Sequence, residues 1–466
     1  MADFFEQIDQ TARALQKAGI RFGGRVAILS ENGPGYTAVI GACLRIGAVA
    51  VPISTRYPAP QVQQVADWMG CSVILASRNF ATAALRGPLV ALEEITGPVA
   101  GDMAAVTLDR IGADLGNPAS IIMTSGSLGE PRGVLHRLSQ HYYSAAGADR
   151  NTPFGPEHTW LMSVPMYHVS GFSILMRAFL RGGRVVFPPN GQTLQQAVLQ
   201  CEATHLSVVP VQLARLMDHP DCIERLRAME AVLLGGSAAC DALVRRALAV
   251  GLPIHTTYGS TEAASQVTTT ARGELIDRVG ASGRLLPYRD LRIAEDGEIR
   301  VGGRTLFDGY VEAGSIRPAI DADGWFHSGD IGALDEAGFL YVRGRRDSMF
   351  ISGGENIHPE QIERVLEEAS GVERAVVVGV PCGDMGQRPV AFVKMRMGEP
   401  LAGETLRHWV AQRLERFKTP VAFLQWPASL DRQEKPNRTA LAARAQGLLA
   451  GRSPQVLKDL PQSLGN

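Results

Sequence analysis

Residues 119–133 read Ala119-Ser-Ile-Ile-Met-Thr-Ser-Gly-Ser-Leu-Gly-Glu-Pro-Arg-Gly133. The first five predict a buried strand, and the ten that follow contain three hydroxyl side chains, three glycines and one arginine. Glycine lets backbone N–H groups approach a bulky anion, and Arg132 can clamp phosphate oxygens with a bidentate fork. The spacing differs from the Walker A pattern. The stretch alone therefore leaves two interpretations open, a binding loop for nucleotide phosphates and an ordinary glycine–serine turn.

The composition is typical of a globular protein without a nucleic-acid or membrane partner. The chain has 466 residues, which predicts two to four structural units at about 150 residues each. Hydrophobic residues make up 45% and charged residues 20%. The net charge of −1 gives no electrostatic reason to expect nucleic acid or an anionic membrane surface. The longest apolar runs are far too short to span a bilayer, so we expect no membrane insertion.

Cysteine usage and the N-terminus favour the cytoplasm. The six cysteines are scattered and form no Cys-x-x-Cys pair, which argues against a zinc site and a disulfide framework. The acidic start of the chain lacks the basic and apolar regions of a signal peptide. We therefore expect a cytoplasmic protein that is a monomer or a homodimer.

The pattern along the chain predicts three kinds of structure. Up to about residue 290, short apolar strands alternate with helices such as 36–46 and 61–69, which indicates parallel βαβ units with helices on both faces of each sheet. From there to about 344, short strands bounded by turn residues predict an antiparallel sheet or a small barrel. A compact α+β unit follows, with a helix over 359–369, and the end of the chain after about Gly451 predicts a loose tail.

Three further motifs carry polar side chains next to glycines. Residues 233–238 run from a strand into a Gly-Gly-Ser turn, against which a flat ligand can lie. In Tyr258-Gly-Ser-Thr-Glu262, the threonine can bind phosphate and the glutamate offers a hard oxygen ligand for Mg²⁺. In Trp325-Phe-His-Ser-Gly-Asp330, the carboxylate can accept hydrogen bonds from a ribose diol. Each motif by itself is more typical of ordinary turn and cap residues.

Taken in order, these motifs resemble those of the adenylate-forming superfamily, which comprises acyl-CoA synthetases, the adenylation domains of peptide synthetases, and luciferases. The resemblance extends over roughly residues 20–445. It also includes the segments Pro165-Met-Tyr-His-Val-Ser-Gly171, Gly344-Arg-Arg-Asp347 and Ser352-Gly-Gly-Glu-Asn-Ile-His-Pro359.

The resemblance implies a role for each motif in binding ATP and Mg²⁺. It assigns the β- and γ-phosphates to the opening loop, with Thr124, Ser125, Gly126, Ser127, Gly129 and Arg132. It assigns the adenine to Gly235, Gly236, Ser237, Tyr258, Gly259 and Ser260. Thr261 serves the α-phosphate, Glu262 binds Mg²⁺, and Asp330 and Arg345 hold the ribose hydroxyls.

The same resemblance implies an α/β fold with two domains that move. Residues 1–346 are expected to form a large N-terminal domain of two doubly wound sheets plus a small β-barrel. Residues 347–466 are expected to form a small, mobile α+β domain, with the hinge at Asp347. The glycines Gly353 and Gly354 would enter the active site in a second conformation and help to admit coenzyme A.

The catalytic lysine of the superfamily lies in a C-terminal Gly-Lys-x-(Asp/Asn)-Arg pattern. Glu434-Lys435-Pro-Asn-Arg438 matches it except at Glu434, and Lys435 is one of only five lysines in the chain. A solvated surface lysine remains the alternative. The implied reaction forms an acyl-adenylate from ATP and a carboxylic acid, releases pyrophosphate, and then transfers the acyl group to the thiol of coenzyme A.

The acid is indicated by the segment that follows Pro165. His168 stands where activators of amino acids usually have Asp, which argues against an amino-acid substrate; we expect His168, Ser170 and Gly171 to face the acid. Arg177 is the one cation in the apolar helical run 171–180. It can meet a second carboxylate on the substrate, or it can make a structural ion pair or extend to solvent.

Several segments resemble bacterial o-succinylbenzoate–CoA ligases of menaquinone synthesis, whose substrate is an aromatic keto-dicarboxylate. An aryl- or medium-chain acyl-CoA ligase is the alternative. Leu128 and Arg132 replace the usual Thr and Lys of the phosphate loop, and Glu434 places a negative charge beside Lys435. A catalytically weakened nucleotide-binding protein of this fold therefore stays open, as does an oxidoreductase of luciferase type.

Overall fold

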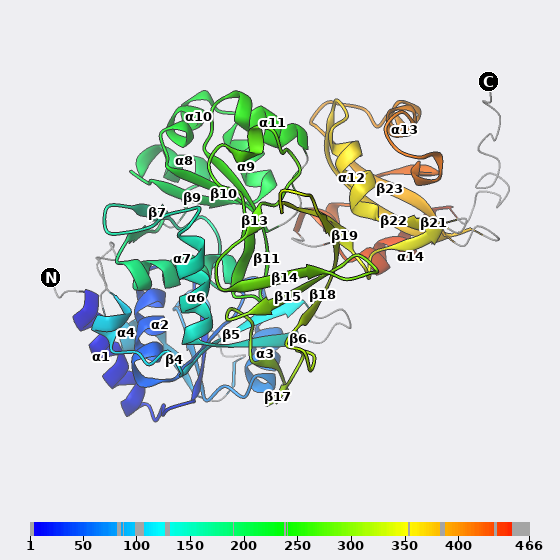
Figure 1. Ribbon diagram of the computed structural model, residues 1–466. Coiled ribbons are helices and arrows are strands. Elements are labelled where there is room, and N and C mark those ends of the chain that lie inside the picture. The colour runs from blue at the N-terminus through cyan, green and yellow to red at the C-terminus, as the bar shows by residue number, and fades with distance from the viewer. Residues whose placement is uncertain are drawn as a thin grey trace, which may run out of the picture.

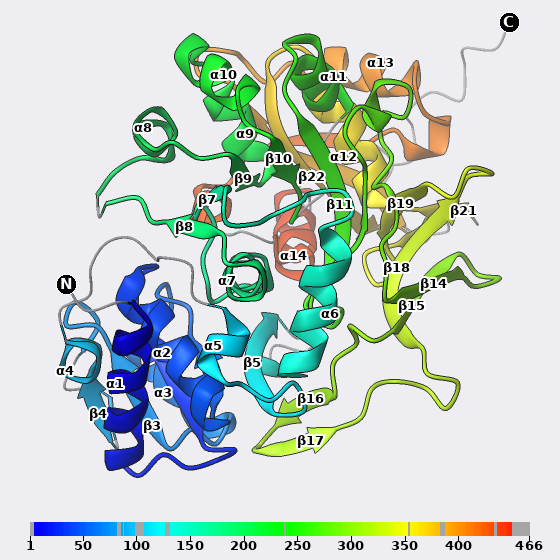
Figure 2. The same cartoon turned by 60° about the vertical axis from the view of Figure 1, so that its left-hand side comes forward.

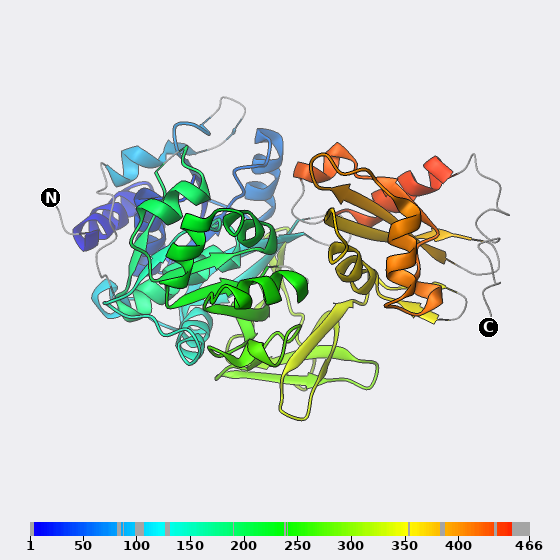
Figure 3. The ribbon, with the colours of Figure 1, turned by 90° about the horizontal axis from the view of Figure 1, so that it is seen from above.

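The computed structural model describes residues 4–81, 85–86, 88–97, 107–125, 131–189, 191–236, 239, 241–352, 355–382, 387–432 and 436–449. Within these ranges only the backbone is described for Ser125, Pro131, Glu355, Asn356 and Arg432. The chain forms a large N-terminal domain and a small C-terminal domain, which stand side by side in the view from above (Figures 1 and 3).

The first sheet of the large domain has eight strands in the order β17-β16-β6-β5-β2-β1-β3-β4. The five strands from β5 to β4 are parallel, and β6, β16 and β17 extend the sheet with antiparallel pairs. The strands are β1 (Arg25–Leu29), β2 (Val49–Pro52), β3 (Val73–Ala76), β4 (Leu89–Ala91), β5 (Pro118–Ser125), β6 (Pro131–Arg137), β16 (Gly309–Glu312) and β17 (Ser315–Arg317).

Alternate residues of β1 enter different cores. Val26 and Ile28 pack with α1 (Phe4–Lys17) and α2 (Pro34–Ile46), whereas Ala27 and Leu29 face α3 (Ala59–Trp68) on the other side of the sheet. The short helices α4 (Leu92–Thr96) and α5 (Leu108–Ile111) flank the same sheet.

The second sheet has seven strands in the order β13-β12-β11-β10-β9-β7-β8, parallel from β11 to β8. They are β7 (Thr159–Leu161), β8 (Arg184–Val186), β9 (His205–Val208), β10 (Ala231–Leu234), β11 (Ile254–Ser260), β12 (Ser265–Thr269) and β13 (Arg284–Leu285). Its outer face is covered by α8 (Leu194–Gln200), α9 (Pro210–Leu216), α10 (Pro220–Arg227) and α11 (Asp241–Ala249).

Two helices lie between the sheets, as Figure 2 shows: α6 (Leu138–Ala148) and α7 (Val169–Arg181). A single core joins Ile122 of the first sheet, Phe172 and Phe179 of α7, and Trp160 of the second sheet. The expected doubly wound architecture is therefore confirmed, with two sheets and helices on both faces of each.

The third part of the large domain is a four-stranded antiparallel sheet in the order β14-β15-β18-β19. Its strands are β14 (Arg289–Ile293), β15 (Glu298–Gly303), β18 (Phe326–Leu334) and β19 (Leu340–Arg345). The sequence predicted either an antiparallel sheet or a small barrel here. The strands pair in a single row, so this part is an antiparallel sheet. This sheet leads directly into the C-terminal domain (Figure 1).

The C-terminal domain is an α+β unit built on the sheet β22-β23-β24, with a two-stranded hairpin at its start. Helices α12 and α13 cover one face of the sheet, and α14 covers the other. The elements are β20 (Phe350–Ser352), β21 (Glu355–Ile357), α12 (Pro359–Glu367), β22 (Val372–Pro381), β23 (Gln387–Met395), α13 (Gly403–Ala411), β24 (Ala422–Gln425) and α14 (Arg438–Leu449). Throughout the described residues, no helix is long and apolar enough to cross a bilayer.

Candidate active site

The glycine–serine loop of residues 124–133 begins at the end of β5 and ends in β6, and these two strands are antiparallel. Thr124 pairs with Arg132 across the hairpin, so both lie at the base of the loop. Gly126, Ser127 and Gly129 fall outside the described residues, as does Leu128. The two ends of this loop are thus held by a ladder of backbone hydrogen bonds between β5 and β6, which fixes their position.

Arg132 contacts the neighbouring strand β16. Its Nε lies 3.5 Å from Oε1 of Glu312, and its guanidinium lies over the ring of Tyr310, 5.6 Å from the centroid. The side chain of Arg132 is 26% exposed, so a ligand can still reach the cation. One carboxylate and one aromatic ring therefore orient the single cation of this loop.

Tyr310 also contacts Glu262, and this contact has no signal in the local sequence. The Tyr310 hydroxyl donates a 2.8 Å hydrogen bond to Oε1 of Glu262. Burial, and then the charge of Glu262, raises the pKa of Tyr310, so the phenol stays protonated and remains the donor. Tyr310 reaches the site only because β16 pairs with β6, at the register Tyr310–Val134.

Glu262 fits a single-carboxylate Mg²⁺ site. It follows Thr261 in the turn after β11, and its backbone carbonyl accepts a hydrogen bond from Phe307 N–H at 2.9 Å. Across the described residues, Tyr310 is the one hydrogen-bond donor to the Glu262 carboxylate, and its second oxygen accepts none. Mg²⁺ commonly takes one or two protein carboxylates and completes its shell with substrate phosphates and water, and the Glu262 side chain offers that arrangement.

The turn after β10 and the end of β11 contain glycines at positions where a larger residue does not fit. A side chain at Gly235 would lie 2.7 Å from Thr257, and Gly236 has φ +79°, a conformation that favours glycine. At Gly259, a Cβ would lie 1.9 Å from a backbone oxygen of Ser265, so no larger residue fits. Because β10 and β11 are adjacent and parallel, these turns lie at the same edge of the sheet. Ser237 is outside the described residues.

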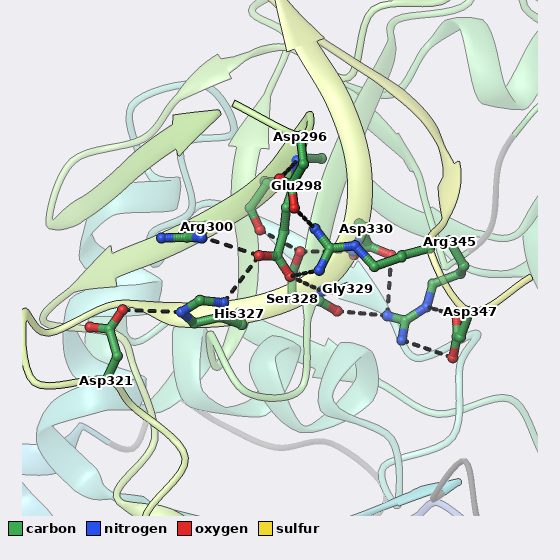
Figure 4. A network of polar contacts seen from close by, with 12 residues as sticks. Asp296, Glu298, Arg300, Asp321, His327, Ser328, Gly329, Asp330, Arg345 and Asp347 are labelled. Atoms are coloured by element: carbon green, nitrogen blue, oxygen red, sulfur yellow. Dashed lines mark hydrogen bonds and ion pairs between the residues drawn. The ribbon is translucent and has the colours of Figure 1, made fainter. Parts of the chain in front are cut away.

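Tyr258 and Arg345 hold the carboxylate of Asp330 (Figure 4 shows Asp330 and Arg345). The Tyr258 hydroxyl donates to Oδ2 of Asp330 at 2.7 Å, and Nη1 of Arg345 lies 3.2 Å from Oδ1. Burial raises the pKa of Asp330, although Arg345 and the Tyr258 hydroxyl oppose that shift. Each carboxylate oxygen has a further lone pair, so Asp330 can still accept from a ribose diol.

Arg345 also bonds the expected hinge residue. Its Nε and Nη2 lie 3.0 and 3.3 Å from the two carboxylate oxygens of Asp347. Burial acts to raise the pKa of Asp347, but the hydrogen bond and charge of Arg345 outweigh it and leave that pKa below its usual value. The side chains of Asp330 and Asp347 are therefore joined through one guanidinium (Figure 4).

The predicted acid-binding residues lie at the start of α7 and inside it. His168 is the residue just before the helix, and its ring contacts that of Tyr167 at 4.7 Å between centroids. Ser170 is half-buried in the first turn. At Gly171, a Cβ would lie 2.3 Å from the Pro165 carbonyl oxygen, so glycine is required for the helix to approach residues 165–166.

Arg177 is 3% exposed and points into the protein. Its Nη1 donates to Oγ1 of Thr152 at 2.8 Å, its Nη2 donates to the side chain of Gln266, and its guanidinium lies 5.0 Å from the ring centroid of Trp160. Burial lowers the pKa of Arg177 to about 10, against the opposing charge of Asp149, so the side chain is still charged at neutral pH. Of the two structural alternatives expected for Arg177, extension to solvent is wrong.

Three further predicted residues, Lys435, Gly353 and Gly354, lie outside the described residues, as does Glu434. The contacts just beyond Lys435 are described. Nη1 of Arg438 donates to Oε1 of Glu363 at 2.5 Å and its Nη2 lies 3.1 Å from Oε1 of Glu360, so the start of α14 is fixed to α12.

Comparison with known proteins identifies relatives of this arrangement. The family model "AMP-binding enzyme" matches residues 1–311, and "AMP-binding enzyme C-terminal domain" matches residues 361–434. A 2-succinylbenzoate–CoA ligase of Bacillus cereus is 33% identical over 427 residues, which cover 89% of this chain and 87% of the relative.

Two solved structures of o-succinylbenzoate CoA synthetase from Bacillus subtilis have the same fold. The complex with the acyl-adenylate intermediate OSB-AMP has a TM-score of 0.82 at 27% identity, covering 94% of this chain and 92% of that one. The complex with ATP and magnesium ion has a TM-score of 0.79 at 27% identity, covering 91% and 90%.

Proposed function

Because this chain belongs to the AMP-binding enzyme family, we propose that it joins 2-succinylbenzoate, an aromatic keto-dicarboxylate, to coenzyme A at the expense of ATP. The chain is an adenylate-forming, AMP-releasing acid–CoA ligase. The identity of the acid is the proposal, and one observation carries it, the buried and unneutralised charge of Arg177.

Arg177 is a cation inside the protein without a directly paired anion. Among the described residues no carboxylate lies within salt-bridge distance of it; Asp149 acts at longer range and bonds Arg181 instead. Its described partners are the hydroxyl and carbonyl of Thr152, the amide of Gln266 and the ring of Trp160, all of them uncharged. A buried charge without an opposite charge beside it is costly. A second carboxylate on the substrate would supply the missing charge.

The partners of Arg177 connect it to the nucleotide site. Gln266, which accepts its hydrogen bond, stands opposite Gly259 in the β11–β12 pair. The guanidinium therefore bonds the residue that pairs with Gly259, at the end of β11 that we assign to the adenine. An acid held between His168 and Arg177 would present one carboxylate to the α-phosphate and keep the other beside the guanidinium.

The reaction needs two displacements. A carboxylate oxygen of the acid attacks the α-phosphorus of ATP, and the bond from that phosphorus to the bridging oxygen breaks as pyrophosphate leaves. The thiol of coenzyme A gives up its proton to solvent, the resulting thiolate attacks the carbonyl carbon of the acyl-adenylate, and the carbon–oxygen bond to AMP breaks. Charge develops on phosphoryl oxygens in the first step, so positive groups placed there lower the barrier.

We assign the residues of this chain accordingly. Thr124, Arg132 and the loop between them hold the β- and γ-phosphates, Gly235–Ser237 and Tyr258–Ser260 hold the adenine, and Asp330 with Arg345 holds the ribose. Thr261 serves the α-phosphate, and Glu262 holds Mg²⁺, which offsets phosphate charge when bound. Lys435 is assigned to the charge that develops on the α-phosphate.

The domain division and the hinge belong to the same proposal. We place the boundary after residue 346, with residues 1–346 as the large domain and residues 347–466 as the small one. Asp347 is the hinge, and residues 352–355 approach the site when the small domain turns. The paired hydrogen bonds between Arg345 and Asp347 support a defined geometry at this boundary. One site has to favour two different steps, so a rearrangement between them is reasonable.

We also propose that the enzyme acts in the cytoplasm, as a monomer or homodimer. ATP and coenzyme A are available there, and the scattered cysteines suit a reducing compartment. Cys43 and Cys222 are buried, and burial raises the pKa of both thiols, so they resist oxidation.

The test is a pyrophosphate-release assay over a panel of acids, with and without coenzyme A. We expect 2-succinylbenzoate to release pyrophosphate and to give a thioester only when coenzyme A is present. Turnover of benzoates or medium-chain fatty acids without turnover of 2-succinylbenzoate would make it an aryl- or medium-chain acyl-CoA ligase. ATP binding without pyrophosphate release from any acid would identify a weakened member of the fold.

A further inference from the structure

Glu298 is a buried carboxylate that none of the roles above uses. It is the first residue of β15, it is 2% exposed, and it lies next to Gly329, the residue before Asp330 in β18 (Figure 4). A carboxylate in such a place is costly unless hydrogen-bond donors and opposite charges surround it. Its partners therefore indicate what it does.

The strands β15 and β18 pair unevenly beside this residue. Glu298 stands opposite Ile331, whereas Arg300 stands opposite His327, so residues 328–330 bulge out of the ladder. Bulges are a common means of aiming a side chain near an active site. The direction of the Asp330 carboxylate therefore depends on the conformation of this bulge.

Glu298 fixes the centre of the bulge. Gly329 has φ +71°, and its N–H, which has left the ladder, donates to Oε1 of Glu298 at 3.2 Å. The two flanking residues are tied to each other, since the N–H of Asp330 donates to Oγ of Ser328 at 3.0 Å.

The hinge arginines hold the opposite side of the same bulge. The N–H of Arg346 donates to the Gly329 carbonyl at 2.7 Å, and Nη1 of Arg345 donates to the Ser328 carbonyl at 2.8 Å. Gly329 is thus bonded through its N–H on one side and through its carbonyl on the other. A substitution of Glu298 removes the partner of the Gly329 N–H and leaves the bond from Arg346 to the Gly329 carbonyl in place. The contribution of Glu298 can therefore be measured separately from that of Arg346.

Glu298 itself is held by three basic side chains. Nε of Arg300 and Nδ1 of His327 lie 3.3 and 3.1 Å from its Oε2 (Figure 4). Nη1 of Arg346 lies 3.6 Å from its Oε1. His327 in turn contacts Asp321 through Nε2, at 3.1 Å. Bonds to charged partners have stricter geometry than neutral ones, so Oε1 is a fixed acceptor for Gly329.

We propose that Glu298 is a positioning residue for nucleotide recognition: by fixing the Gly329 N–H it sets the bulge that aims the Asp330 carboxylate at the ribose hydroxyls. The inference rests on the proposed function, because it takes Asp330 as the ribose-binding residue. It predicts that Glu298 controls the preference for a ribonucleotide without touching the nucleotide.

Calorimetric titration of the full chain with AMP and with 2′,3′-dideoxy-AMP tests the proposal without turnover. We expect the parent protein to bind AMP at least about tenfold more tightly, since the diol bonds a charged acceptor. In Glu298→Gln the amide cannot satisfy the same set of donors, so the bulge relaxes. The preference should fall to about threefold or less, chiefly through weaker binding of AMP.

Asp321→Asn is the matched control, because it also converts an acid to its amide in the same network, on the far side of His327. It should keep the parent's preference. A Glu298→Gln protein that binds both nucleotides more weakly by one common factor, or keeps the parent's preference, would overturn the inference. If Glu298→Gln does not fold, Glu298→Asp replaces it, because the shorter side chain keeps the negative charge among the basic groups but withdraws it from Gly329. Equal weakening for both nucleotides, or an unchanged preference for AMP, would then overturn the inference in the same way.

The parent protein separates this inference from the proposed function. A parent that binds AMP and dideoxy-AMP equally would refute the assignment of Asp330 to the ribose, and with it the inference. A parent that prefers AMP, together with a Glu298→Gln variant that does so to the same extent, leaves the assignment of Asp330 standing and refutes only the role of Glu298.

Discussion

The phenolic hydroxyl of Tyr310 donates a 2.8 Å hydrogen bond to Oε1 of Glu262. The same ring lies beneath the guanidinium of Arg132, 5.6 Å from its centroid. One side chain of β16 therefore connects the assigned metal ligand with the cation of the phosphate loop. The hydroxyl orients Glu262 and donates to its Oε1. In the proposed role, Oε2 would be the oxygen available to Mg²⁺.

Removing this hydroxyl should weaken the binding of the metal. We expect Tyr310→Phe to raise the Mg²⁺ concentration for half-maximal activity by about tenfold, the range for losing a hydrogen bond to a charged group. The measurement is a Mg²⁺ titration of pyrophosphate release at saturating ATP and acid. An unchanged Mg²⁺ requirement would show that Glu262 is positioned without Tyr310.

Tyr310→Leu separates the ring from the hydroxyl. It lacks both, so it should show the Mg²⁺ defect of Tyr310→Phe and, in addition, a higher KM for ATP, because Arg132 loses its aromatic support. If the two variants have the same KM for ATP, the ring contributes nothing to the position of Arg132.

Removing the charge of Arg177 should weaken the binding of dicarboxylic acids and leave the binding of monocarboxylic acids unchanged. Arg177→Gln is expected to raise KM for 2-succinylbenzoate by about tenfold or more, because the second carboxylate then lies in a buried site without a cation. A benzoate that lacks the second carboxylate should show little change in KM. The comparison needs steady-state kinetics with both acids on one preparation.

Arg181→Gln is the control for this prediction, since it removes a charge from the exposed end of the same helix. Its pairing with Asp149 lies outside the proposed acid site, so KM for both acids should stay as in the parent. An Arg177→Gln variant that loses activity equally toward both acids would identify a purely structural role for Arg177, in holding Thr152 and Gln266.

The sheets could be predicted because their signals are local. Short apolar strands alternate with helices within segments of a few residues, and the helices over 36–46, 61–69 and 359–369 end within two residues of their expected bounds. The residues that we assign to the nucleotide also belong to short local motifs, and Thr124, Tyr258 and Asp330 lie within the strands β5, β11 and β18. Tyr258 and Asp330, which lie far apart in the sequence, proved to be in contact.

The supporting residues could not be predicted in this way. Tyr310 reaches Glu262 through the pairing of β16 with β6, and Glu298 reaches Gly329 through a bulge between β15 and β18. Both relationships depend on strand register, which joins distant segments and leaves no pattern in either one. The partners of Arg177 were hidden for the same reason: Thr152 follows α6 and Gln266 lies on β12.

Lys435 should be needed for only one half of the reaction. We expect Lys435→Ala to abolish adenylate formation, because charge on the α-phosphate is then unopposed, and largely to spare the conversion of supplied acyl-adenylate to thioester. Single-turnover assays of each half-reaction make the comparison. Lys394→Ala removes a lysine that pairs with Glu373 and Asp431 on the same domain, and both steps should survive it. Equal losses in both steps of Lys435→Ala would refute the assignment.

The buried His136 should make the large domain sensitive to acid. It is fully buried on β6, and burial lowers its pKa from 6.5 to about 4. The folded protein therefore keeps His136 neutral, whereas the unfolded chain takes up a proton as the pH falls below about 6.5. Stability is complete above that pH and is lost as the pH falls toward about 4, with a loss of about 2 kcal/mol between pH 7 and pH 5.

His136→Gln removes this titration while keeping a polar side chain of similar length. The substitution also changes packing, so the variant is compared with the parent at two pH values. The informative quantity is how the difference in their free energies of unfolding changes between pH 7 and pH 5. Between pH 7 and pH 5 we expect the free energy of unfolding to fall by about 2 kcal/mol less in the variant than in the parent. The thermal midpoint of the variant should therefore also fall less. His219→Gln, at an exposed histidine, should follow the parent at both pH values. If the variant and the parent differ in free energy of unfolding by the same amount at pH 7 and at pH 5, His136 takes up its proton in the folded protein as readily as in the unfolded chain.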